Sequence, residues 1–272
     1  HPGCLEYEGD MNLMKAGLAF SEKINTVSPR YAREIQTLEY GAGLDGMLRA
    51  RAKDLSGILN GVDYTLWNPA TDPHIPANYT VDDLAGKAAC KRALQKTFGL
   101  PEKDVPIFGV VTRLYWQKGM DVLVPALDRM EDGHAQVVVL GSGDPGLEKY
   151  LWEASQRKPD SFRVTFKYDV GLSHLIQAGS DFFLMPSRYE PCGLTQMYCL
   201  AYGAIPVVRR TGGLADTVLD INAVNLRRNT ATGITFVPLS VEALDNAIQR
   251  ALALYANRPL FKEVQQRGMK QD

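Results

Sequence analysis

The run Glu-Pro-Cys-Gly-Leu-Thr-Gln at positions 190–196 combines residue types that could bind both a phosphate and a sugar. It follows an apolar stretch at 182–185 and a short turn, and it leads into a stretch with the pattern of a helix. Backbone N–H groups at a helix start that follows a strand carry partial positive charge, and they suit an anion such as phosphate. The carboxylate of Glu190 is better suited to hydroxyl groups. Phosphate and polyol together indicate a nucleotide sugar.

Two cations, Arg113 and Lys118, flank a second turn between an expected strand and an expected helix. Tyr115 and Trp116 lie between them, and Gly119 follows. At the ligand edge of a parallel sheet, the planar guanidinium and the compact ammonium suit a diphosphate. Considered alone, two solvated surface charges would be the commoner interpretation of such a pair.

Apolar runs alternate with amphipathic stretches through most of the chain, which predicts alternating strands and helices. The expected strands are 107–111, 136–140, 162–166, 182–185, 205–208 and 234–236. The expected helices are 120–130, 145–156, 172–178, 193–202, 213–221 and 241–255. This alternation predicts the α/β class, as a Rossmann-like parallel sheet with helices on both faces and ligands beyond the carboxyl ends of its strands.

The first 59 residues differ in character, and we interpret them as the C-terminal remnant of a preceding Rossmann-like domain. Within them we expect a helix at 10–22, a strand at 24–27, a helix capped by Ser28 and a strand at 55–59. Residues 60–272 are expected to form a nucleotide-sugar-binding Rossmann-like domain, truncated at its end.

Thr80 and Asp83 have the spacing of a helix-opening box, and we expect a helix from there to about Gly99. The last residues, 265–272, show no closing element, and the first residue is His1 rather than Met. Both ends therefore look cut, and we expect a piece of a longer protein.

The formal net charge of −1 gives no electrostatic footprint for nucleic acid or for an anionic membrane. The sequence has neither an apolar run of membrane-spanning length nor a signal-peptide pattern. The cysteines are Cys4, Cys90, Cys192 and Cys199, and their spacings predict free thiols in a reducing cytoplasm. The histidines at 74, 134 and 174 are scattered, so a metal site is not indicated.

The run at 190–196, followed by Arg-Arg-Thr-Gly-Gly-Leu-Ala-Asp-Thr-Val at 209–218, resembles bacterial glycogen synthases and plant starch synthases, glycosyltransferase family five. Thr-Arg-Leu at 112–114 with Gln-Lys-Gly at 117–119 resembles the upstream motif of the same family. The likeness implies the C-terminal half of a GT-B fold. It also implies transfer of glucose from ADP-glucose to the non-reducing end of an α-1,4-glucan, with retention of configuration and without a metal or other cofactor.

The resemblance further implies roles for particular residues. Arg113 and Lys118 would bind the diphosphate and neutralise the charge that develops as it leaves. Glu190 would contact the hydroxyls of the donor sugar. These three are the predicted catalytic residues.

Donor-binding roles are implied for a second set of residues: Asn60, Tyr168, Cys192, Gly193, Leu194 and Thr195. Tyr168 matches a tyrosine that stacks on adenine, and Asn60 an asparagine that touches the donor sugar. Cys192 would lie near the glucose, and residues 193–195 would supply backbone and hydroxyl donors to phosphate and ribose. Related glycosyltransferases place a second Glu eight positions after the first, where this chain has Tyr198.

Alternatives remain open at this point. The chain could belong to a retaining glycosyltransferase that uses a UDP-sugar, or it could be a domain that binds a nucleotide sugar and catalyses nothing. The family's Lys-x-Gly-Gly-Leu loop and its active-site His have no equivalent here, so the chain alone is expected to be inactive. Gly141-Ser142-Gly143 is too incomplete a fingerprint to favour a nicotinamide dehydrogenase. The pair Gly212-Gly213 fits close backbone packing as well as it fits ligand contact. The parent enzyme is expected in the cytoplasm, or in the plastid of a plant.

Overall fold

The structure is a computed structural model, and it describes residue 3 and residues 5–131 and 133–271. The chain divides into two compact units. The smaller unit takes the chain up to Gly61 together with Tyr189–Gly193 and Thr211–Asp216, and the larger takes Val62–Arg188, Leu194–Arg210 and the chain from Thr217 onward. The domain boundary predicted between residues 59 and 60 stays a prediction.

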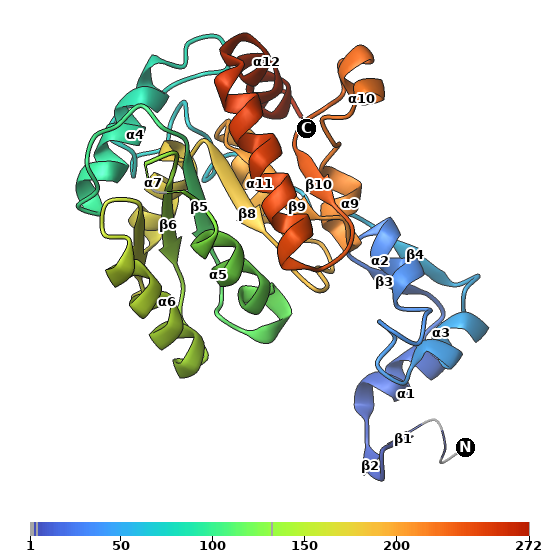
Figure 1. The fold of residues 1–272 in the computed structure, drawn as a ribbon. Helices are drawn as coiled ribbons and strands as arrows, with labels where there is room; N and C mark the ends of the chain where they lie inside the picture. Colours follow the sequence, from blue (N-terminus) through green and yellow to red (C-terminus); the bar gives the residue numbers. More distant parts are fainter. Residues whose placement is uncertain (1–2, 4, 132, 272) are drawn as a thin grey trace. The chain divides into compact units, whose positions relative to one another are not determined.

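In the described part of the larger unit, six strands form one parallel sheet in the order β10–β9–β8–β5–β6–β7 (Figure 1). The strands are β5 (Ile107–Val111), β6 (Gln136–Leu140), β7 (Phe162–Thr165), β8 (Phe182–Met185), β9 (Ile205–Arg209) and β10 (Ile234–Phe236). The predicted α/β class with a Rossmann-like parallel sheet is thereby confirmed. All six strands lie where the apolar runs predict them.

Helices cover both faces of this sheet (Figure 1). The helices in the described part of the larger unit are α4 (Ala85–Thr97), the short 3-10 helix η2 (Trp116–Lys118), α5 (Met120–Asp128), α6 (Pro145–Arg157), α7 (Val170–Gly179), α8 (Thr195–Ala201), α10 (Ala223–Arg227), α11 (Val241–Ala256) and α12 (Arg258–Met269). Among the described residues, no helix is long and apolar enough to cross a bilayer.

Successive strand residues point to opposite faces, which divides the core into two layers. Phe108 and Val110 of β5 pack in one hydrophobic cluster with α5, α6 and α11. Ile107, one residue away, packs in another cluster with Leu94 of α4 and Ile176 of α7. Each buried side chain of this size contributes about 1.5–3 kcal/mol relative to an exposed one. Because both faces of the strands are buried, their sequences are continuously apolar rather than alternating.

The helix α12 closes the larger unit, although the sequence predicted no closing element there. Phe261 of α12 is buried, and its ring centroid lies 5.5 Å from that of Phe182 and 5.2 Å from that of Tyr255. Val264 on the same helix is fully buried. The polar residues around these two hide the helix from a pattern search, because the apolar stripe of α12 is narrow.

The smaller unit holds the elements β1 (Glu6–Tyr7), β2 (Asp10–Met11), α1 (Leu13–Phe20), β3 (Ile24–Thr26), α2 (Pro29–Glu34), α3 (Asp45–Ala50) and β4 (Leu55–Gly57). β3 pairs with β4 in parallel. The predicted cap of α2 is confirmed, because Ser28 Oγ accepts a hydrogen bond of 2.9 Å from the N–H of Tyr31. The helix expected from residue 10 is wrong at its start: Asn12 caps α1, and the two residues before it belong to β2.

Two other helix boundaries differ from the prediction. The N–H of Asp83 donates a hydrogen bond of 3.2 Å to the Thr80 hydroxyl, but α4 begins only at Ala85, so these two residues are not its N-cap and third position. The Asp83 carboxylate still accepts a hydrogen bond of 3.0 Å from the N–H of Ala85. The helix expected at 213–221 is the short α9 (Gly212–Thr217). It ends early because Asp220 forms a β-bridge with Gly233.

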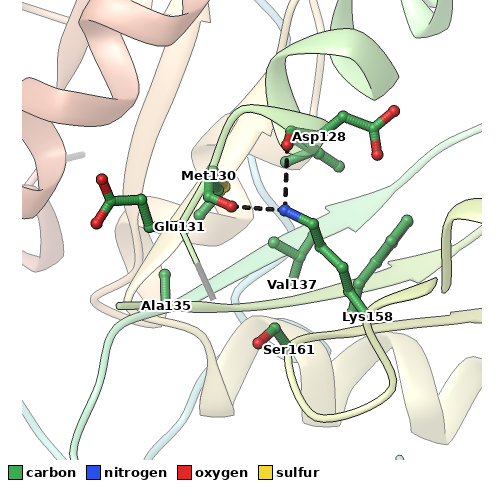
Figure 2. Close-up of a pocket in the computed structure, with 9 residues that line it drawn as sticks. Asp128, Met130, Glu131, Ala135, Val137, Lys158 and Ser161 are labelled. Carbon is green, nitrogen blue, oxygen red and sulfur yellow. Dashed lines mark hydrogen bonds between the residues drawn. The ribbon is translucent and has the colours of Figure 1, made fainter. Parts of the chain in front are cut away.

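The carboxyl end of α5 is capped by Lys158, as Figure 2 shows. Its ammonium group donates hydrogen bonds of 3.1 Å to the carbonyl of Asp128 and 2.6 Å to that of Met130. A cation suits this end of a helix because the unpaired carbonyls carry partial negative charge. The cavity beside it measures about 10 Å³, which is space for one water molecule at most. This lysine therefore has a structural role.

Replacing Phe261 by Ala should destabilise the protein by about 3–5 kcal/mol, because the ring leaves a cavity between α11, α12 and the sheet. Urea denaturation followed by circular dichroism measures the change. The matched control is Lys262→Ala, since Lys262 is exposed on the same helix. Equal stability of the two variants would mean that α12 does not belong to the core.

Candidate functional site

A cavity of about 360 Å³ lies at the carboxyl ends of β5 and β6 in the larger unit. Its volume is within the range of sites that bind small ligands. The described residues that line it are Trp67, Val111, Thr112, Arg113, Leu140, Gly141, Ser142, Tyr168, Ser173, Gln177, Thr195 and Tyr198. This is the edge of the sheet at which doubly wound folds bind ligands.

The predicted site residues fall into three groups. Arg113, Tyr168 and Thr195 line the cavity together. Lys118 ends η2 and Leu194 precedes α8, and neither is among the described lining residues. Asn60, Glu190, Cys192 and Gly193 belong to the smaller unit.

Arg113 is exposed, and its guanidinium carbon lies 5.9 Å from the ring centroid of Tyr115. The strand β5 positions it, because the chain leaves that strand two residues earlier. Arg113 therefore lies at the wall of the cavity and is also accessible to solvent. It can bind an anionic group of a ligand whose uncharged part occupies the cavity.

Arg188, which follows β8, holds the turn that carries Lys118. Its guanidinium donates a hydrogen bond of 2.7 Å to the carbonyl of Trp116 and lies 4.2 Å from the ring of that residue. Two further hydrogen bonds, of 2.7 and 2.6 Å, run to the carboxylate of Asp121 and lower the pKa of that group. Gly119 has a φ of 69°, and a side chain there would meet the carbonyl of Pro186. The loops after β5 and β8 are therefore fixed against each other.

Tyr168 and Tyr198 present phenol groups at the same cavity. Burial raises the pKa of Tyr198, and the nearby groups Tyr168 and Asp63 raise it further. The hydroxyl of Tyr198 therefore stays protonated at neutral pH and can donate a hydrogen bond. Tyr168 is 64% exposed, so one of its faces is open for a planar ligand to stack on.

In the smaller unit, Glu190 and Cys192 are buried. Burial raises the pKa of the Cys192 thiol, and the carboxylates of Glu190 and Asp216 raise it further, while a backbone hydrogen bond with Asn60 acts in the opposite direction. The thiol is therefore neutral at physiological pH and is a poor nucleophile. Cys192 suits a packing role rather than covalent catalysis.

The pair Gly212-Gly213 packs on the same segment. The N–H of Gly213 donates a hydrogen bond of 3.0 Å to the carbonyl of Glu190, and a Cβ at Gly213 would meet the carbonyl of Cys192. The N–H of Gly212 donates to a carboxylate oxygen of the buried Glu34 at 3.0 Å. Of the two interpretations left open for this pair, close backbone packing is the one that the contacts support.

The glycines of Gly141-Ser142-Gly143 also serve backbone packing. A Cβ at Gly141 would meet the carbonyl of Thr112, and the N–H of Leu114 donates a hydrogen bond of 2.9 Å to the carbonyl of Ser142. The loops after β5 and β6 are thereby tied side by side at the floor of the cavity.

Sequence reasoning did not assign Trp67, Ser173, Gln177 or Tyr198 to a site. Ser173 and Gln177 are polar residues four positions apart in α7, and that spacing could have indicated a polar stripe facing a ligand. Trp67 lies at the start of a proline-rich segment, where periodicity gives no signal.

Free thiols are found at Cys90, Cys192 and Cys199, all of them buried, while Cys4 lies outside the described residues. His74 and His174 are not scattered as the sequence suggested, because their ring centroids lie 4.8 Å apart. Within the described residues, side chains of His, Cys, Asp and Glu form no group of three that could hold a metal ion.

Comparison with protein families gives two matches along the chain. The family described as starch synthase catalytic domain matches residues 1–50. The family described as glycosyl transferases group 1 matches residues 92–268, which is more than half of the chain.

The chain is similar to curated proteins named glycogen synthase. It is 53% identical to that of Myxococcus xanthus over 100% of this chain and 55% of the relative, and 50% identical to that of Anaeromyxobacter dehalogenans over 98% and 56%. Among solved structures, it matches the catalytic domain of starch synthase IV from Arabidopsis thaliana bound to ADP and acarbose. The TM-score is 0.91 at 39% identity, covering 96% of this chain and 54% of that one. The chain therefore spans about half the length of these relatives.

Replacing Gly213 by Ala should destabilise the protein by about 1–3 kcal/mol, because the added methyl group displaces the backbone that carries Glu190 and Cys192. The midpoint of urea unfolding measures the change. Gly17→Ala is the control: it lies within α1 with open space around it, and Ala should stabilise that helix by roughly 0.5–1 kcal/mol. A Gly213→Ala variant as stable as the parent would contradict the close packing.

Proposed function

Because this chain belongs to the glycosyl transferases group 1 family, we propose that it is the nucleotide-sugar-binding part of a glycogen or starch synthase. The parent enzyme transfers glucose from ADP-glucose to the non-reducing end of an α-1,4-glucan and retains the anomeric configuration. The relatives named glycogen synthase support the reaction, and the related starch synthase with bound ADP supports the nucleotide. Since the chain spans about half of these relatives, the activity belongs to the longer protein.

The observation that carries this proposal is the cavity at the carboxyl ends of β5 and β6. Arg113 stands at its wall as a cation, Tyr168 offers an exposed aromatic face, and Thr195 adds a hydroxyl at the start of α8. A nucleoside diphosphate has one part for each of these groups: charged phosphates for Arg113, a planar base for Tyr168, and phosphate and ribose oxygens for Thr195.

The proposed chemistry needs charge stabilisation more than a nucleophile. The bond between C1 of the glucosyl group and the diphosphate oxygen breaks, and C1 forms a new bond to a hydroxyl oxygen of the glucan on the same face. The proton of that hydroxyl moves to the leaving diphosphate. Negative charge grows on the diphosphate in the transition state, and preorganised cations stabilise it there. Arg113 and Lys118 supply that charge, so we infer that the reaction needs no metal or other cofactor.

The residues of the smaller unit are assigned to the sugar in this proposal. Glu190 accepts hydrogen bonds from the glucosyl hydroxyls, and Asn60 contacts the same sugar. Cys192 fills space beside it as a neutral thiol, and Gly193, with a φ of 70°, keeps the backbone turn that leads into α8. Close packing of Gly213 on this segment supports a fixed position for Glu190 within its own unit.

Replacing Arg113 by Ala in the full-length parent should lower turnover by roughly 10²–10³ while changing the KM for ADP-glucose much less, because the charge that Arg113 meets grows in the transition state. Lys118→Ala should behave similarly. Steady-state kinetics of glucose incorporation into glycogen measures both.

The control for these variants is Arg92→Ala, an exposed arginine on α4. It should leave turnover unchanged. If Arg113→Ala and Lys118→Ala also stay within twofold of the parent, neither residue belongs to the site.

The protein should bind ADP more tightly than UDP, because a purine covers more of an aromatic ring than a pyrimidine does. Tyr168→Ala should reduce this preference. Titration calorimetry with both nucleotides measures it. Equal or tighter binding of UDP by the parent would instead favour a UDP-sugar as the donor.

A further inference from the structure

Three aromatic rings form a stack beside the cavity of the larger unit. The ring of Trp67 lies between those of Tyr198 and His174, with centroid distances of 3.9 and 4.0 Å and interplanar angles of 5° and 11°. Trp67 and Tyr198 both line the cavity, whereas His174 is 4% exposed and lies behind them. The stack joins three separate parts of the unit, namely the irregular segment after Val62, α7 and α8.

A buried carboxylate fixes the inner end of this stack. Asp72 is 2% exposed, and one of its oxygens lies 2.8 Å from Nδ1 of His174 and 2.5 Å from the hydroxyl of Tyr202. The other oxygen accepts a hydrogen bond of 2.8 Å from the N–H of His74. A carboxylate can only accept, so Nδ1 of His174 carries a proton. The imidazole cannot turn without breaking this bond, and its plane sets the plane of Trp67.

This arrangement is a costly way to fill a core. Desolvating a carboxylate costs several kcal/mol, and well-packed apolar side chains of similar volume are often equally stable or more stable. A hydrogen-bonded network instead specifies one orientation of the groups that it holds. Here the group held at the outer end is the ring of Tyr198, a residue that lines the cavity.

We propose that Asp72, His174 and Trp67 are positioning residues for nucleoside binding, which hold Tyr198 against the cavity wall and keep the cavity open. This inference rests on the proposed function, because it takes the nucleoside of the donor as the occupant. Ordering a free side chain on binding costs about 0.5–1.5 kcal/mol, and a ring that is already stacked avoids that cost. The stack acts only on the uncharged part of the ligand, since the phosphates are assigned to Arg113.

Titration calorimetry on the full-length parent with two probes, ADP and inorganic pyrophosphate, tests this proposal. Trp67→Leu should weaken ADP binding about 5–10-fold, the equivalent of about 1–1.4 kcal/mol, and should leave pyrophosphate binding within twofold. Trp67→Phe, which restores a ring between Tyr198 and His174, should recover ADP binding to within threefold. Trp152→Leu is the matched control, because Trp152 is 52% exposed on α6 and does not line the cavity among the described residues.

His174→Asn is a milder second variant if Trp67→Leu does not fold, because its amide can still donate to Asp72 while the stack loses a ring. It too should weaken ADP binding and spare pyrophosphate. Unchanged ADP binding in these variants, or an equal loss of affinity for ADP and for pyrophosphate, would overturn the proposal. A purely structural role would lower the Tm of the variants without changing the ratio of the two affinities. A parent that binds neither probe would instead contradict the proposed function.

Discussion

The site in the larger unit depends on one reversal of strand order in the parallel sheet. β5 and β8 are neighbours, but the chain leaves β5 toward β6 on one side and leaves β8 toward β9 on the other. The helices that follow these two strands pack on opposite faces of the sheet. Doubly wound folds bind their ligands beyond the strand ends at such a reversal.

The loops around this space are held by contacts that leave little freedom. Arg188, which follows β8, donates a hydrogen bond to the turn after β5. A side chain at Gly119 in that turn would meet the carbonyl of Pro186 after β8, and a side chain at Gly141 after β6 would meet the carbonyl of Thr112 after β5. Cations and aromatic rings can therefore stand at fixed places around the cavity before any ligand arrives. Preorganisation of this kind is what both tight binding and electrostatic stabilisation of a leaving group require.

The sequence predicts the sheet well because strands buried on both faces are short, continuous apolar runs, as in Phe182–Met185. It predicts α12 badly, because Phe261 and Val264 are the main buried apolar residues of that helix and most of their neighbours are polar. Arg113 and Tyr168 follow the ends of their strands, but the family resemblance, and not the strand pattern, assigned them to a site. Trp67 could not be assigned from the sequence, because its partners His174 and Tyr198 come from distant helices, and nothing local to the proline-rich segment indicates that three rings meet. The motif glycines were recognised, but their contacts with neighbouring backbone needed coordinates.

A crystal structure of the full-length protein with ADP tests most directly whether the cavity is the nucleotide site. The diphosphate should lie beside the Arg113 guanidinium, and the nucleoside should occupy the space between Tyr168, Tyr198 and the ends of β5 and β6. ADP ordered elsewhere on the protein, with this cavity left to water, would contradict the assignment.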